Sequence, residues 1–148
     1  MRNRALELAK QWLEKADHDL VTARAVLAIA DGPTDTPCFH AQQAVEKALK
    51  ALLTARGVRF ERVHDLLAHL DAVAAHVPTL KPYRERIAGL AGYAVEVRYP
   101  GDSVEPSRDD AMAAVVVAEE VVRAIAATVP IAGNDRTRRK QRSRRAPG

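Results

Sequence analysis

The stretch from Phe39 to Leu53 constrains the fold of this chain more than any other segment. It reads FHAQQAVEKALKALL, contains neither Gly nor Pro, and is rich in Ala and Leu, which have high helix propensity. Its apolar residues recur at the three- and four-residue spacing of one helical face. They are Ala41, Ala44, Val45, Ala48, Leu49, Leu52 and Leu53. The sequence therefore predicts a helix that buries one long face in a core.

A second, polar stripe runs along the same predicted helix. It consists of His40, Gln43, Lys47 and Lys50, with Gln42 and Glu46 beside it. One interpretation is a solvated face, with Glu46 and Lys50 as an ordinary i,i+4 ion pair. The other is a surface that binds a ligand or a second copy of the chain.

Four more helices are predicted, so we expect an all-α, up-and-down bundle of about five helices. Gly and Pro residues separate the helical patterns, since neither continues a helix well. The expected ranges are about 3–30, 36–56, 65–75, 80–97 and 107–129. The expected N-terminal caps are Asn3 for the first helix, Thr36 or Asp35 for the second and Asp65 for the third. No stretch alternates with the two-residue period of a strand.

Composition agrees with close helix packing in one domain. Only 4% of the 148 residues are aromatic, so the core has to consist mainly of Ala, Val and Leu. No apolar run approaches the roughly 20 residues that a membrane span requires, and the N-terminus does not have the pattern of a signal peptide. The expected location is the cytoplasm. The single cysteine, Cys38, is expected to be structural.

The net positive charge of the chain is concentrated in its C-terminal residues. Residues 131–148 contain seven of the 23 Lys and Arg residues and one of the 19 acids, which gives them a net charge of +6. The other 130 residues then hold 16 basic and 18 acidic residues, a net charge of −2. We therefore predict a helical domain at 1–130 and a disordered Arg-rich tail at 131–148. RNA affinity of the tail through phosphate contacts and a tail without a specific partner both remain open.

Several classes of site have no sequence signal. The five histidines form no HExxH motif, and the single cysteine excludes a cysteine pair. The glycines form no phosphate-binding loop. No metal and no cofactor are expected.

The end of the predicted fourth helix carries a different signal. Arg98 and Tyr99 stand directly before Pro100. An Arg there can form paired hydrogen bonds to a phosphate while a Tyr stacks on a base. Equally, Arg98 can satisfy helix-end carbonyls or pair with Glu46 or Glu96, with Tyr99 packed on the bundle.

Three blocks together resemble the HEPN domain family of prokaryotes. They are FHAQQAVEKALKALL, HDLLAHL and YAVEVRYPGD, the last followed by a helix containing AMAAVVVAEEVV. The resemblance extends from Trp12 to about Thr128. It implies a helical bundle that forms a homodimer. It implies further that the partner in a toxin–antitoxin-like pair is a minimal nucleotidyltransferase. It also implies RNA cleavage in many members, through an Arg followed, after four to six residues, by a His.

The chain departs from this Arg–His motif. Arg98 matches the arginine, but the positions for the histidine hold Ser103, Val104 and Glu105, and no His follows His76. Neither Ser nor Val can replace His in proton transfer near neutral pH. His64 is a weak candidate to substitute for it.

Because the chain resembles the family but lacks this histidine, the sequence favours a non-catalytic or degenerate HEPN protein. Such a protein would bind its partner and a nucleotide or RNA. A metal-independent ribonuclease toxin with an altered active site is the alternative. The expected binding residues are Arg98, Tyr99, Lys47, Lys50, Gln43 and His40.

Overall fold

The computed structural model describes residues 2–60, 65–93 and 105–130, and in these ranges every regular element is helical. The prediction of an all-α bundle is confirmed. The α-helices are α1 (Arg2–Leu27), α2 (Asp35–Ala55), α3 (Leu66–Ala74), α4 (Arg84–Leu90) and α5 (Arg108–Thr128). Two short 3-10 helices, η1 (Pro78–Tyr83) and η2 (Ala91–Tyr93), flank α4.

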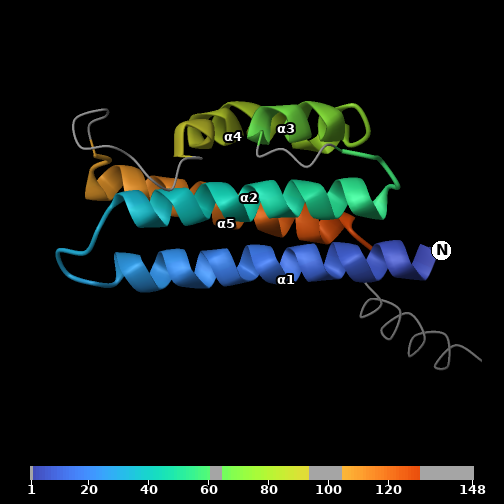
Figure 1. Ribbon diagram of the computed structural model, residues 1–148. Helices are drawn as coiled ribbons and strands as arrows, with labels where there is room; N and C mark the ends of the chain where they lie inside the picture. Colours follow the sequence, from blue (N-terminus) through green and yellow to red (C-terminus); the bar gives the residue numbers. More distant parts are fainter. Residues whose placement is uncertain (1, 61–64, 94–104, 131–148) are drawn as a thin grey trace, which may run out of the picture.

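Helix α2 is the centre of the bundle. It runs antiparallel to α1, with α5 behind it and with α3 and α4 on the side opposite α1 (Figure 1). Thirteen of its 21 residues are buried, because neighbouring helices cover it on three sides. The segment that the sequence singled out is therefore the element on which the others pack.

Small residues are fully buried in both α1 and α2, which pack along each other. Ala9, Ala16 and Ala23 of α1 are fully buried, as are Ala41, Ala44, Ala48 and Ala51 of α2. Without bulky side chains between them, the two helix backbones can approach closely. Larger residues of α2, such as Leu49 and Leu52, fill the rest of the core. The predicted core of Ala, Val and Leu is confirmed.

Several helix ends follow the local sequence signals. Gly57, just beyond the C-cap of α2, has φ +68°, a conformation that glycine adopts without strain. The Asp65 carboxylate accepts a hydrogen bond from Ala68 N at the start of α3. Ser107 and Asp110 form a reciprocal capping box at the start of α5.

The predicted ends of the first two helices were partly wrong. Helix α1 starts before Asn3 and ends at Leu27, three residues earlier than expected. Helix α2 starts at Asp35, so Thr34 is its N-cap and makes no capping hydrogen bond through its side chain. The Asp35 carboxylate instead accepts from Thr36 N within the first turn.

The fourth predicted helix is not one regular helix. Residues 78–93 form η1, α4 and η2 in succession. Pro82 lies inside η1, and because proline has no N–H it cannot continue an α-helical hydrogen-bond pattern there. Residues 94–97 lie outside the described residues, as does the predicted tail at 131–148. In the described ranges, no helix combines the length and the apolar character needed to cross a membrane.

Candidate functional site

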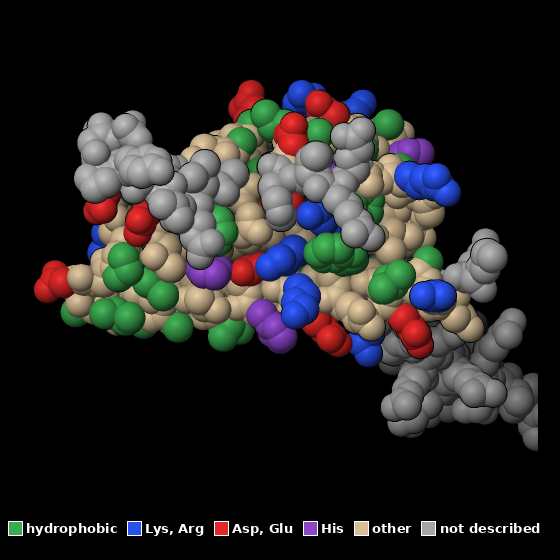
Figure 2. All heavy atoms as spheres, viewed as in Figure 1, with side chains coloured by type: hydrophobic (Ala, Val, Ile, Leu, Met, Phe, Trp, Pro, Cys, Tyr) green, Lys and Arg blue, Asp and Glu red, His purple; other side chains and the backbone are tan. Residues whose placement is uncertain are grey.

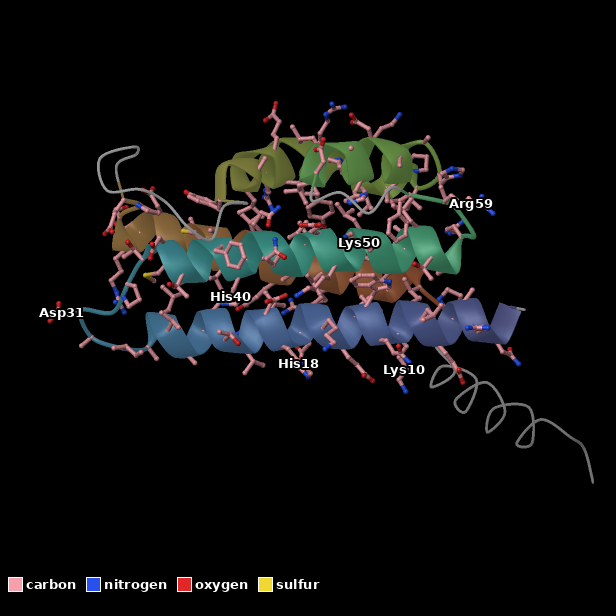
Figure 3. The ribbon with its side chains drawn as sticks, in the orientation of Figure 1. Lys10, His18, Asp31, His40, Lys50 and Arg59 are labelled. Carbon is pink, nitrogen blue, oxygen red and sulfur yellow. The ribbon has the colours of Figure 1, made fainter. Side chains whose placement is uncertain are left out.

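The polar stripe of α2 lies along the line where α2 meets α1. Figure 2 shows acidic, basic and histidine side chains next to one another along this line. In Figure 3, His40 and Lys50 lie on α2, whereas Lys10 and His18 point away from it on the far side of α1. The stripe is not a solvated face, since Lys50 is buried and the other three members are half-buried.

A carboxylate from α1 joins two residues of the stripe. Asp19 Oδ1 lies 2.8 Å from His40 Nδ1, and Asp19 Oδ2 accepts a hydrogen bond from Lys47 Nζ at 2.5 Å. Asp19 is 8% exposed, while about a quarter of each partner's side chain is exposed. The Asp19 cluster, as we call Asp19, His40 and Lys47, thus has a buried anion and two partners that reach solvent.

A second ion pair lies within α2 and is more deeply buried. Lys50 Nζ lies 2.9 Å from Glu46 Oε1, with side-chain exposures of 9% and 1%. The ammonium also lies 5.2 Å from the centre of the Trp12 ring, a cation–π contact to α1. The i,i+4 pairing of Glu46 and Lys50 is as the sequence suggested, but the pair is part of the interior.

Two glutamines link this pair to the rest of the stripe. Gln43 Nε2 donates to Gln42 Oε1 at 2.7 Å and to Glu46 Oε2 at 3.3 Å. Gln42 is fully buried, and its own Nε2 has no hydrogen-bond partner among the residues that the structure describes. An unpaired buried donor costs on the order of 1–3 kcal/mol. This face of α2 is therefore not optimised for stability alone.

The charges of the stripe balance one another. Two ammonium groups, on Lys47 and Lys50, pair with two carboxylates, on Asp19 and Glu46. The stripe is consequently not a cationic patch of the kind that binds RNA non-specifically. The stripe can instead offer a ligand hydrogen-bond donors in fixed positions and an imidazole held by a carboxylate.

Three residues expected at a site lie outside the described residues, namely Arg98, Tyr99 and His64. His69, in contrast, is described and is 2% exposed, with its ring edge-on to Phe60 at 5.5 Å between centroids. In the described part of the chain, no group of three His, Cys, Asp or Glu residues could hold a metal ion.

Sequence reasoning missed Asp19, although its carboxylate connects α1 to two residues of the stripe. A signal was present, because Asp19 lies three residues after Ala16 and four before Ala23, both buried in the core. An acid at that spacing falls at the edge of the apolar face. Its partners, 21 and 28 residues away, could not be identified from helical periodicity.

The comparisons with known proteins give the family. A family model described as "HEPN domain" matches residues 9–128, most of the chain and nearly all of the bundle. The chain belongs to the HEPN domain family. Helices α2 and α5, and α1 from Ala9 on, lie inside the matched range, so the Asp19 cluster is part of the HEPN domain itself.

One curated relative is similar over part of the HEPN domain. It is "Putative toxin MJ1304" of Methanocaldococcus jannaschii, 37% identical over 57 residues. The match covers 38% of this chain and 36% of the relative, so the chain spans only about a third of that protein. No solved structure matches the chain.

Proposed function

We propose that this HEPN protein is the toxin-like member of a toxin–antitoxin-like pair and binds RNA or a nucleotide through the α2 stripe. Family membership supports the general role, as does the name of the similar archaeal protein. The proposed partner is a minimal nucleotidyltransferase, and the proposed location is the cytoplasm.

The observation that carries the proposal is the burial of charge along α2. Glu46 is 1% exposed, Lys50 7% and Asp19 8%. Removing ions from water is expensive, and hydrophobic residues of similar volume often give equal or greater stability. Charges retained at such a position are therefore better explained by a function of this face than by stability.

The exposed members of the stripe are the proposed contacts. His40, Gln43 and Lys47 lie three and four residues apart on one side of α2 and are half-buried. Their donors can reach phosphate and base edges. Arg98 and Tyr99 complete the proposed set, whereas Lys50, also expected there from the sequence, is left out because its side chain is 9% exposed and paired with Glu46. Because Lys47 is already paired with Asp19, we expect few released counterions and hence a weak salt dependence of binding.

Fluorescence anisotropy with labelled RNA oligonucleotides and with nucleotides tests this binding. We expect Lys47→Gln and Arg98→Ala each to weaken binding, and the matched control Lys10→Gln on the far side of α1 to leave it unchanged. Equal affinity of wild type and both variants would remove these residues from the site. Co-expression and co-purification with a nucleotidyltransferase encoded next to this chain tests the partner.

The proposal includes a homodimer formed through the exposed apolar residues of α1 and α5. Val21, Met112 and Val116 are each about half exposed. The Arg24–Glu119 ion pair connects α1 and α5 next to these residues in the chain. Apolar side chains exposed on two neighbouring helices favour self-association. The double variant Met112→Glu with Val116→Glu should then be monomeric by light scattering. A wild-type monomer would contradict the dimer.

A further inference from the structure

The two ends of the bundle carry opposite charges. Residues 28–36 and 105–110, where α1 ends and where α2 and α5 begin, hold five acids and one arginine. Residues 2–7 and 54–60, where α1 begins and α2 ends, hold four arginines and one acid. The bundle is therefore electrically polarised along its axis, although residues 1–130 together carry a net charge of only −2.

The packing of α1 on α2 places three arginines at the same end of the bundle. The two helices are antiparallel, and Trp12 of α1 contacts Lys50 of α2. Arg4 lies about 12 Å from Trp12 along the helix axis, at 1.5 Å per residue. Arg56 lies about 9 Å beyond Lys50 in the same direction. Figure 3 labels Arg59 at this end. We call Arg4, Arg56 and Arg59 the basic end.

The three arginines of the basic end are available to a ligand. All three are exposed, and none forms an ion pair or a side-chain hydrogen bond with a described residue. In contrast, Arg24, Arg84 and Arg86 each pair with a carboxylate. Arg108 donates to a backbone carbonyl of α1, whereas Arg123 has no such partner among the described residues. Guanidinium groups without a partner can form the paired hydrogen bonds that phosphate oxygens accept.

Helix stability does not account for all of these charges. Positive charge is favourable at the C-terminal end of a helix, so Arg56 and Arg59 suit the end of α2. Arg4 lies in the first turn of α1, where positive charge is unfavourable, and this turn contains no acid. An anionic ligand that contacts both helix ends explains all three residues.

The C-terminal segment of the chain adds more positive charge at this end. The first residue of α5, Arg108, donates to Leu27 O at the end of α1. Further along α5, Glu119 pairs with Arg24, which precedes Leu27 in α1. Helix α5 is therefore antiparallel to α1 and ends toward the start of α1 (Figure 1). Residues 131–148 follow α5 with seven basic residues and one acid.

We propose that the basic end and residues 131–148 bind the phosphate backbone of an RNA strand whose neighbouring nucleotides contact the α2 stripe. This inference rests on the proposed function of the stripe and adds a second contact region to it. Arg4 and Asp19 are about 22 Å apart along α1, so only a strand of several nucleotides contacts both. The acidic end repels the strand, which favours one direction of RNA along the bundle.

The two contact regions differ in their response to salt. Each phosphate that a Lys or Arg neutralises releases counterions, so the log–log slope of affinity against salt is about −0.7 per contact for a single strand. The stripe contributes little to this slope, because its lysines are already paired. The basic end and residues 131–148 contribute most of it. Phosphate contacts alone are weak at physiological salt, with Kd on the order of 10⁻⁴–10⁻⁶ M, so stable binding also requires the stripe.

The test compares three variants of the full-length protein. The end variant carries Arg4→Gln, Arg56→Gln and Arg59→Gln. The control variant carries Lys81→Gln, Arg84→Gln and Arg86→Gln, which remove three exposed cations from η1 and α4 and change the net charge equally. The tail variant carries Arg136→Gln, Arg138→Gln, Arg139→Gln, Lys140→Gln, Arg142→Gln, Arg144→Gln and Arg145→Gln.

Fluorescence anisotropy is measured with a labelled mononucleotide and with a labelled RNA of about 30 nucleotides, between about 50 and 200 mM NaCl. We expect wild type to lose affinity for the long RNA by about 10²- to 10⁴-fold over this range. The slope should become shallower by about 2 in the end variant and by up to about 5 in the tail variant, but not in the control variant. Mononucleotide affinity should be equal in all four proteins and change little with salt.

The remaining outcomes separate this inference from the proposed function. A slope for the long RNA as shallow as that for the mononucleotide overturns the role of the basic end and leaves binding at the stripe intact. Equal losses in the end and control variants also overturn it, because net charge alone then explains the effect. Salt-sensitive binding of the long RNA that Lys47→Gln does not weaken supports the basic end and contradicts the stripe.

A different anionic surface is tested with the same proteins. Vesicles of phosphatidylserine and phosphatidylcholine present negative charge without a nucleic acid strand. We expect wild type to prefer the long RNA to these vesicles at equal salt. A preference for the vesicles that the end variant loses would identify a lipid surface as the ligand and overturn the assignment of RNA.

Discussion

Two lysines of α2, less than one turn apart, are held in opposite environments. Lys50 pairs with Glu46 inside one helix, and both are nearly inaccessible, with side-chain exposures of 9% and 1%. Lys47 pairs with Asp19 of a different helix, and a quarter of its side chain is exposed. A histidine shares only the second carboxylate. The first pair belongs to the interior of the bundle, whereas the second can meet a ligand from solution.

The stripe therefore has two parts that differ in their exposure to solvent. The Lys50 ammonium of the Glu46–Lys50 pair contacts the Trp12 ring and so connects α2 to α1. Because both side chains of the pair are almost inaccessible, a ligand cannot reach most of the pair. The Asp19 cluster holds an imidazole and an ammonium at the surface. We therefore propose that the Asp19 cluster contacts the ligand and that the buried pair fixes the position of the helix that carries the cluster's His40 and Lys47.

The largest effect on stability is expected at the buried pair. Lys50→Met keeps most of the side-chain volume but removes the ammonium next to the Glu46 carboxylate. Breaking a buried ion pair at one partner costs about 3 kcal/mol or more. Urea denaturation measures the change, and the double variant with Glu46→Gln should recover part of it. A loss under about 1 kcal/mol for Lys50→Met would remove the contrast between the two pairs.

A smaller effect is expected at the Asp19 cluster. In Asp19→Ala, Lys47 and His40 lose their acceptor but can turn toward water, so we expect a loss of about 1–2 kcal/mol. Because Lys47 is partly exposed, 1 M NaCl should reduce the effect of Asp19→Ala. The same salt should hardly change the effect of Lys50→Met. Equal salt sensitivity of the two variants would show that their environments are alike.

The local features of the fold could be predicted from the sequence. Helix periodicity, the glycine after α2 and the Ser107 capping box depend on residues within one turn of each other. The irregular η1–α4–η2 segment was harder, because Pro82 lies within a pattern that otherwise reads as helix.

The candidate site could be predicted only in part. The stripe and its Glu46–Lys50 pair follow from helical spacing on α2. The role of Asp19 depends on how far α1 is shifted along α2, which the pattern of either helix alone does not specify. For the same reason, the sequence could not show that the stripe is partly covered by α1.

The smallest effect is expected for an ion pair that joins α4 to α5 at the surface. Arg86 and Glu120 lie 2.5 Å apart but have side-chain exposures of 54% and 45%. Pairs that are this exposed contribute between zero and about 1 kcal/mol. Arg86→Ala should therefore change the unfolding free energy by less than about 0.5 kcal/mol and leave RNA binding unaffected. A larger change would mean that the exposure of an ion pair does not indicate how much it contributes to the unfolding free energy of this bundle.

Urea denaturation of the triple variant Asp19→Leu, His40→Phe and Lys47→Met tests the central claim most directly. The claim is that the Asp19 cluster is retained for function rather than for stability. We predict an unfolding free energy within about 1 kcal/mol of wild type, since apolar replacements of a buried ionic cluster are often neutral or stabilising. RNA binding should be lost in the same variant. A loss of several kcal/mol together with wild-type RNA binding would contradict the account.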